Sequence, residues 1–185
     1  MESEAIRKAR AAKKAATDLA LATTEQKNKA LSYIAHGLEE HSDDILQANQ
    51  KDLERAKQNG MAPAMVDRLR LTKERIADMA EGVRQLMDLP DPVGTVLDEW
   101  TRPNGLSIQK ITVPLGVICI IFESRPNVTV DAASLCIKSG NATVLRGGSE
   151  AISSNTALSH ILKEGLEKAG LPGDAVGLME DTDRA

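Results

Sequence analysis

Apolar positions in the first half of the chain recur with the spacing of helices. Leu31, Ile34, Ala35 and Leu38 stand at i, i+3, i+4 and i+7 and form one apolar stripe. A second stripe follows the same rule between positions 76 and 87, in the order Ile76, Met79, Ala80, Val83, Leu86 and Met87. This pattern predicts an α-helical region over residues 1–94.

Capping residues predict where these helices begin and end. Thr23 and Gln26 have the spacing of a capping box, and Ser42 and Thr72 stand where they would cap the next two helices. The first helix is expected over residues 4–22, the third near residues 42–60, and the last to end at Pro90.

The pattern changes after Gly94. Residues 106–113 alternate imperfectly, as in a strand with a bulge near Gln109, and residues 117–122 (VICIIF) form a continuous apolar run. Such a run is typical of a parallel strand that helices cover on both faces. We expect helices over residues 128–139 and 149–169 and strands over residues 142–146 and 175–179.

The order from residue 117 onward is therefore strand, helix, strand, helix, strand. This alternation predicts an α/β fold with a Rossmann-like parallel sheet. Residues 95–185 would form this domain, with the helical region 1–94 packed on it. The sheet would be open on one side, so we expect a partial domain from a longer protein.

Composition narrows the class of protein. The 185 residues include 42% hydrophobic but only 2% aromatic residues, so the core must be largely aliphatic. The net charge of −4 provides no basic field for nucleic acid. We find no signal-peptide or membrane-spanning stretch, and no metal-binding spacing of cysteine and histidine. The two cysteines suit a reducing cytoplasm.

One candidate ligand-binding loop follows the strand that ends at Arg146. Gly147 and Gly148 allow the backbone to approach a ligand closely, and Ser149 and Glu150 open the next helix, whose amides attract anions. An arginine at a strand end binds phosphate in a forked geometry, which suits the 2′-phosphate of NADP. The alternative is a simple strand-to-helix connection, because the GxGxxG fingerprint is absent.

A second candidate loop, residues 123–127, contains Glu123, Arg125 and Asn127. Charged side chains after a buried strand are candidates for substrate contact. The alternative is that Arg125 pairs with Glu123 and shapes the turn. Cys119 lies within the apolar run, so we interpret it as a buried structural cysteine rather than a nucleophile.

The segment VPLGVICIIFESRPNVTVDAASLCIKSGNATVLRGGSEA, residues 113–151, resembles the γ-glutamyl phosphate reductase family of the aldehyde dehydrogenase superfamily. GLPGDAV, and upstream ANQKDLERAKQNG, DRLRLTKERI and LPDPVG, are also similar to that family, so the resemblance spans nearly the whole chain. It implies NADPH-dependent reduction of L-glutamyl 5-phosphate to L-glutamate 5-semialdehyde in proline biosynthesis, through a cysteine thioester.

The resemblance also implies roles for particular residues. Arg146, followed by Gly147, Gly148, Ser149 and Glu150, would bind NADPH. Asn127 would position the substrate carbonyl oxygen, and Arg125 would contact an anionic substrate group. The nucleophilic cysteine of the family belongs to a later catalytic domain that neither Cys119 nor Cys136 matches, so the chain should be inactive alone.

The resemblance also implies partners, and two alternative functions stay open beside it. The resemblance implies a homo-oligomer and association with glutamate 5-kinase. One alternative is a non-catalytic nucleotide-binding or subunit-interaction module. Another is an NAD(P)-dependent aldehyde dehydrogenase of different specificity, although FESRPN favours the reductase.

Overall fold

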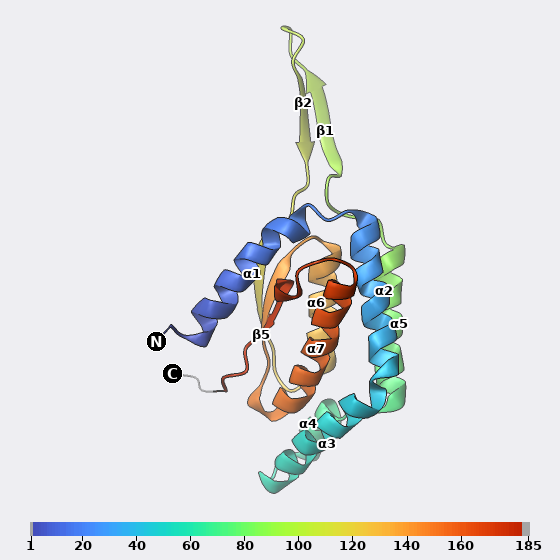
Figure 1. Ribbon diagram of the computed structural model, residues 1–185, viewed down its shortest axis with the longest axis vertical. Helices are drawn as coiled ribbons and strands as arrows, with labels where there is room; N and C mark the ends of the chain where they lie inside the picture. Colours follow the sequence, from blue (N-terminus) through green and yellow to red (C-terminus); the bar gives the residue numbers. More distant parts are fainter. Residues whose placement is uncertain (1, 183–185) are drawn as a thin grey trace.

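The computed structural model describes residues 2–182 and contains a helical layer, a small parallel sheet and a hairpin (Figure 1). The helices are α1 Glu4–Ala20, α2 Thr24–Glu40, α3 Ser42–Gln58, α4 Pro63–Leu69, α5 Lys73–Asp88, α6 Asn127–Lys138 and α7 Ile152–Lys168. The strands are β1 Val96–Thr101, β2 Ser107–Ile111, β3 Val117–Ile121, β4 Ala142–Arg146 and β5 Val176–Leu178. Short 3₁₀ turns span Ser149–Ala151 and Gly173–Ala175.

The caps of two N-terminal helices agree with the sequence. Thr23 and Gln26 form the predicted capping box of α2, and the Thr72 hydroxyl accepts the Arg75 N–H at the start of α5. Ser42 does not cap α3, because the helix already includes it and His41 is the N-cap residue. The seven-residue helix α4 was not predicted, since it is too short to show an apolar stripe.

Strands β3, β4 and β5 form a parallel sheet in that spatial order. Ile121 pairs with Arg146, and Leu145 pairs with Leu178, so the carboxyl ends of the strands meet at one edge. The connections through α6 and α7 confirm the predicted Rossmann-like fold. This edge is where ligands bind in open α/β sheets.

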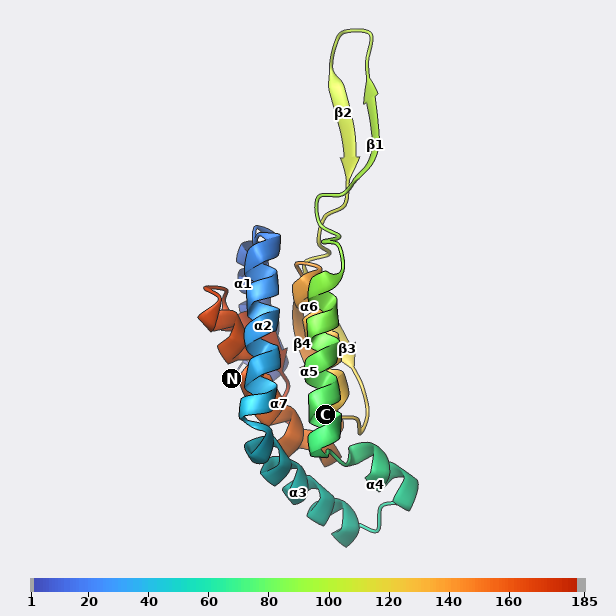
Figure 2. The same cartoon turned by 90° about the vertical axis from the view of Figure 1, so that its right-hand side faces the viewer.

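Helices cover the sheet unequally. Helix α1 contacts all three strands, whereas α6 and α7 contact β4 and β5 from the other side (Figure 1). Helices α2 and α5 lie side by side and form an outer layer, with α2 on α7 and α5 on α6 (Figure 2). The N-terminal helices thus belong to the same packed body as the sheet.

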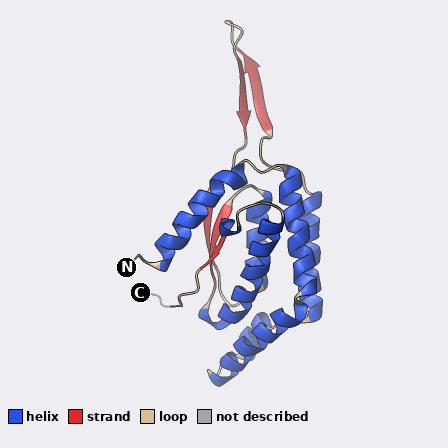
Figure 3. Ribbon diagram, in the orientation of Figure 1, coloured by secondary structure: helices blue, strands red, loops and turns tan. Residues whose placement is uncertain are grey.

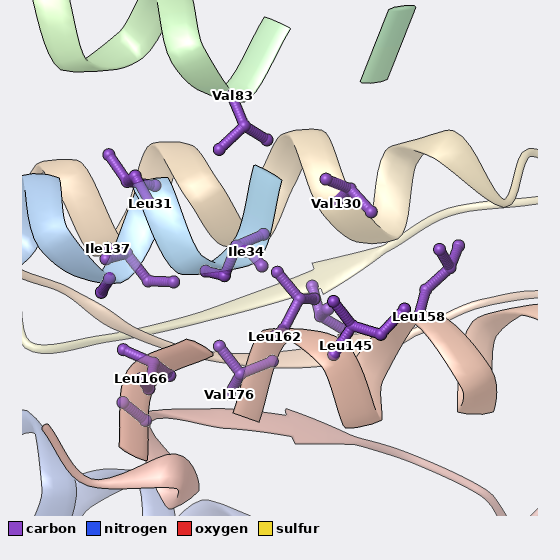
Figure 4. Packing of buried hydrophobic residues seen from close by; sticks show 14 of the residues in the cluster. Leu31, Ile34, Val83, Val130, Ile137, Leu145, Leu158, Leu162, Leu166 and Val176 are labelled. Carbon is purple, nitrogen blue, oxygen red and sulfur yellow. The ribbon is translucent and has the colours of Figure 1, made fainter. Parts of the chain in front are cut away.

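Aliphatic side chains from both layers share one core (Figure 4). Each fully buried side chain of this kind contributes about 1.5–3 kcal/mol to folding. Helices α2 and α7 approach each other closely, since a Cβ added to Gly165 would lie 2.5 Å from Ile34 Cγ1 and 3.3 Å from the Ala30 carbonyl oxygen. The labelled core residues of Figure 4 include Leu31, Val83, Val130, Ile137, Leu145, Leu158 and Leu162.

The prediction that residues 117–122 are covered on both faces is wrong. Alternate side chains of β3 are exposed, and Ile121 keeps 76% of its accessible surface. Cys119 is exposed as well, so its interpretation as a buried cysteine is also wrong. The apolar run correctly indicates a parallel strand, but in the described residues β3 is an edge strand.

Strands β1 and β2 form an antiparallel hairpin that projects from the body (Figure 3). Strand β1 was not predicted, because its acidic residues hide the apolar pattern. The bulge predicted near Gln109 is not found in β2; the register shift falls between Val96 and Asp98 of β1, opposite Ile111 and Lys110. The division at residue 94 stays a prediction about domain organisation.

Candidate functional site

The loop that follows β4 lines a cavity of about 750 Å³ at the carboxyl edge of the sheet. All five residues predicted to bind cofactor border it, together with Phe122 from the end of β3; they are Arg146, Gly147, Gly148, Ser149 and Glu150. Met179, which follows β5, borders it too. Three strand ends therefore contribute to one cavity, as the parallel order requires.

The two glycines are needed for space rather than for an unusual backbone conformation. Gly148 has φ −66°, which any residue adopts. A Cβ on Gly148 would overlap the Glu150 carboxylate, and a Cβ on Gly147 would overlap the Asn155 amide and lie 3.1 Å from the Phe122 ring. A side chain is therefore excluded at Gly147, whereas one at Gly148 would require the Glu150 side chain to move.

Glu150 connects the two candidate loops. Its carboxylate accepts a short hydrogen bond from the hydroxyl of Ser124, which is only 2% exposed. Ser124 was not singled out from the sequence, because a lone serine in a polar loop gives no signal. This bond fixes the loop after β3 against the loop after β4, at the wall of the cavity.

Helix α7 begins three residues later than predicted, and anion binding by the amides of the loop that precedes it stays a prediction. Ser149 lies in the 3₁₀ turn before α7 and caps nothing. The Ser153 and Ser154 N–H groups at the start of α7 donate to the carboxylate of Asp52, at 3.1 and 2.7 Å. Because this fully buried carboxylate already satisfies them, these amides do not bind an anion.

Arg125 and Asn127 border a different cavity, of about 420 Å³, between α4, α5 and α6. Arg125 forms no ion pair with Glu123 within residues 2–182; only the Arg125 N–H reaches the Glu123 carbonyl, at 2.8 Å. The alternative that these two side chains pair is therefore not observed. The sequence predicted both loops, but not that they face separate cavities.

Asn127 is oriented by its neighbour on α6. Its side-chain amide donates to the Asp131 carboxylate at 3.0 Å. Burial raises the pKa of the Asp131 carboxyl above its usual value, although the hydrogen bond from Asn127 acts in the opposite direction. Asp131 still borders the cavity, so its carboxylate is available to a ligand there.

Four arginines surround this second cavity, and sequence reasoning identified only one of them. Arg68 lies on α4, Arg70 between α4 and α5, and Arg75 on α5. The guanidinium of Arg75 donates to the carbonyl oxygens of Asp67 and Arg70, both at 2.7 Å. The segment DRLRLTKER contains the signal, but a helical arginine is usually interpreted as a solvated surface residue.

Neither cysteine borders either cavity. Cys119 is exposed on β3, whereas Cys136 is buried on α6. Burial raises the pKa of the Cys136 thiol, against the effect of a hydrogen bond involving Thr143. Within residues 2–182 no group of three or more acidic, histidine or cysteine side chains could hold a metal ion. No helix of the described chain is long and apolar enough to span a membrane.

Comparison with known proteins agrees with the motifs. The chain is 55% identical over 182 residues to a γ-glutamyl phosphate reductase of Geobacillus sp. (strain WCH70). Its structure is similar to that of a γ-glutamyl phosphate reductase from Thermotoga maritima, with a TM-score of 0.97 and 44% identity over 98% of this chain. A Saccharomyces cerevisiae γ-glutamyl phosphate reductase superimposes with a TM-score of 0.91 at 32% identity, over 99% of this chain and 48% of its own.

These similarities cover nearly all of this chain and less than half of each relative. The match spans 98% of this chain but 44% of both the Geobacillus protein and the Thermotoga structure. The predicted resemblance to γ-glutamyl phosphate reductases is confirmed over this part. The aldehyde dehydrogenase family model matches residues 1–185, so the chain belongs to the aldehyde dehydrogenase family.

Proposed function

We propose that this chain forms the cofactor-binding part of a reductase that converts L-glutamyl 5-phosphate to L-glutamate 5-semialdehyde with NADPH, a step of proline biosynthesis. The observation on which this depends is the cavity at the end of β4, bordered by Arg146 and the open glycine loop. The similarity to γ-glutamyl phosphate reductases supports the choice of reaction.

Membership of the aldehyde dehydrogenase family implies the use of NAD or NADP. The residues present fit such a group, because Gly147 and Gly148 border the cavity without side chains and a ligand can therefore approach their backbone. Such a nucleotide supplies a hydride when it is bound. The choice of NADPH is part of our proposal and depends on Arg146.

Arg146 is proposed to bind the 2′-phosphate that distinguishes NADP from NAD. It is the last residue of β4, so its backbone is fixed by pairing with Ile121, while the side chain borders the cavity. A guanidinium binds phosphate through two parallel hydrogen bonds. At other phosphate sites the N–H groups of a helix N-terminus bind the phosphate. Here Asp52 accepts from the Ser153 and Ser154 N–H groups, so we assign phosphate binding to the Arg146 side chain.

The substrate is an activated acyl phosphate, so the reaction needs a nucleophile and a donor for the carbonyl oxygen more than a strong acid. We propose that the Asn127 amide, which donates to Asp131 at 3.0 Å, positions the substrate in the cavity that both residues border. Neither thiol borders the cavity at the end of β4 or the one between α4, α5 and α6, so we propose that another part of the full-length enzyme provides the nucleophile.

We also propose self-association and a cytoplasmic location. The hairpin supports self-association, because Leu97, Trp100 and Leu106 are exposed on it. Two free cysteines are compatible with a reducing compartment. Association with glutamate 5-kinase stays a prediction from the resemblance.

The test is the substitution Arg146→Ala in the full-length enzyme. The variant should raise the KM for NADPH at least about tenfold and change the KM for NADH little, because a charge-assisted pair to phosphate is worth roughly 1.5–3 kcal/mol. Arg102→Ala, in the hairpin turn, is the matched control. Equal losses with both nucleotides would remove the 2′-phosphate role. The isolated chain should show no turnover.

A further inference from the structure

We propose that the cavity between α4, α5 and α6 binds the α-amino-acid end of the substrate. Its arginines would bind the α-carboxylate, and the Asp131 carboxylate would bind the α-ammonium group. This assignment rests on the proposed function and identifies which part of the substrate Arg125 contacts. It makes Arg68, Arg70 and Asp131 residues that determine specificity.

Arg75 prepares the site without being available to the ligand. Its guanidinium is occupied by the carbonyl oxygens of Asp67 and Arg70 and also approaches the Asp67 carboxylate at 3.4 Å. These bonds close the turn between α4 and α5. They hold the backbone of Arg70 at the rim of the cavity.

Arg68, Arg70 and Arg125 are the arginines available to a ligand. Across residues 2–182 none of their side chains forms a hydrogen bond or an ion pair, and all three are exposed. They come from three separate segments: helix α4, the α4–α5 turn and the loop after β3. Converging guanidinium groups attract a carboxylate or a phosphate.

The acidic side chains decide between these two anions. Asp78 and Asp131 border the same cavity as the three arginines. The arginines attract either anion, but only an amino acid also carries an ammonium group, which the two carboxylates would attract. The mixed lining therefore complements a zwitterionic amino acid better than a phosphoryl group.

A third cavity connects the arginine-lined cavity to the proposed cofactor cavity at the end of β4, and this arrangement indicates how the substrate would lie. A third cavity, of about 250 Å³, shares Arg68 and Arg125 with the arginine-lined cavity. It shares Phe122, Glu123 and Ser124 with the cofactor cavity. The three cavities follow one loop in sequence, so a substrate held by its amino-acid end would extend its reactive end toward the cofactor.

The test uses inhibition of the full-length enzyme by L-glutamate and by glutarate, which lacks the ammonium group. The wild type should bind L-glutamate more tightly than glutarate. Asp131→Asn should abolish this preference, and Arg70→Ala should weaken both inhibitors about tenfold or more. Arg70→Lys should recover part of the loss, and the hairpin variant Arg102→Ala should change neither constant. Urea midpoints confirm that the variants are folded.

The outcomes separate this inference from the proposed function. If Asp131→Asn keeps the preference, or Arg70→Ala weakens neither inhibitor, while NADPH-dependent turnover persists, the site assignment is overturned and the function stands. If the enzyme does not turn over glutamyl phosphate, the function fails. Nuclear magnetic resonance titration of the chain with L-glutamate and glutarate then decides the assignment, which is overturned unless L-glutamate shifts residues around Asp131.

Discussion

The carboxylate of Asp52 on α3 accepts hydrogen bonds from both the N–H and the hydroxyl of Ser154, a residue 102 positions later in the chain. The distances are 2.7 and 2.6 Å, and both residues are fully buried. Ser154 also accepts a bond from Asn49, whose side chain holds the backbone of Leu69 and Leu71. One polar network thus joins α3, the α4–α5 turn and the start of α7.

Asp52→Ala should destabilise the chain by roughly 2–4 kcal/mol, because it leaves buried donors of α7 without an acceptor. Urea unfolding followed by circular dichroism measures the change. Asp18→Ala, on the exposed surface of α1, is the control and should stay within about 0.5 kcal/mol of the wild type. Equal midpoints for Asp52→Ala and the wild type would show that the network does not matter for stability.

Gly165→Ala and Gly82→Ala should change stability in opposite directions. A methyl group at Gly165 would meet Ile34 and the backbone of α2, so we expect a loss of about 1–3 kcal/mol. Gly82 has no neighbour within 4 Å of its added Cβ, and helix propensity alone should stabilise that variant by about 0.5–1 kcal/mol. Thermal melting of the two variants measures both changes in stability. A change of the same sign in both would contradict the close contact between α2 and α7.

Asp91→Asn should alter the pH dependence of stability. Burial by itself raises the pKa of Asp91, but bonds from Lys27, Thr24 and the Val93 N–H together lower it below its usual value. Lys27 is buried and lies 2.5 Å from the carboxylate. We expect Asp91→Asn to cost roughly 1–3 kcal/mol at pH 7.

The sign of this dependence follows from the lowered pKa. The stabilisation is complete above the unfolded-state value of about 3.9 and is lost as the pH falls through the folded-state value. The difference in the free energy of unfolding between wild type and Asp91→Asn should therefore be constant from pH 7 to about 5 and decrease below pH 4. Urea unfolding across this range tests it, and a difference independent of pH would rule out the charged pair as its source.

A thiol reagent should react quickly with one of the two cysteines. Cys119 is exposed on β3, whereas Cys136 is buried and its thiol has a raised pKa. Titration with Ellman's reagent should give one fast equivalent in the native chain and two in denaturant. Cys119→Ser should remove the fast phase. If the fast phase remains in this variant, Cys136 is the reactive thiol and Cys119 is not exposed.

Trp100, the single tryptophan, should report self-association through the hairpin. It is 39% exposed, with Leu97 and Leu106 also exposed on the same hairpin. Its emission should shift to shorter wavelength as protein concentration rises, in step with the mass from light scattering. Leu97→Glu should suppress both changes. A concentration-independent spectrum of a monomeric chain would exclude the hairpin as an association surface.

The sequence predicted the parallel unit because residues 117–178 follow local rules closely. An apolar run, a glycine after each helix and short strands leave little choice of topology. Strand β1 was not predicted because Asp98 and Glu99 interrupt its apolar pattern. All its side chains are exposed, so the sequence needs no alternation of apolar and polar residues there. The burial of β3 was overestimated, since apolar composition does not reveal how many neighbours a strand has.

The candidate site was predicted where consecutive residues define it and missed where separate segments meet. The loop from Arg146 to Glu150 is contiguous, so the sequence placed it at one cavity. Arg68 and Arg70 lie more than fifty positions before Arg125, and Asp52 lies a hundred before Ser154. No local pattern contains such pairings, because tertiary packing alone creates them.

The occupied amides of α7 have a consequence for the evolution of nucleotide choice. A helix dipole is a property of the backbone and cannot be removed by one substitution, whereas an arginine can. With Asp52 neutralising the start of α7, discrimination between the two dinucleotides would reside in a single exchangeable side chain at the end of β4. Relatives could then switch coenzyme by exchanging this one side chain.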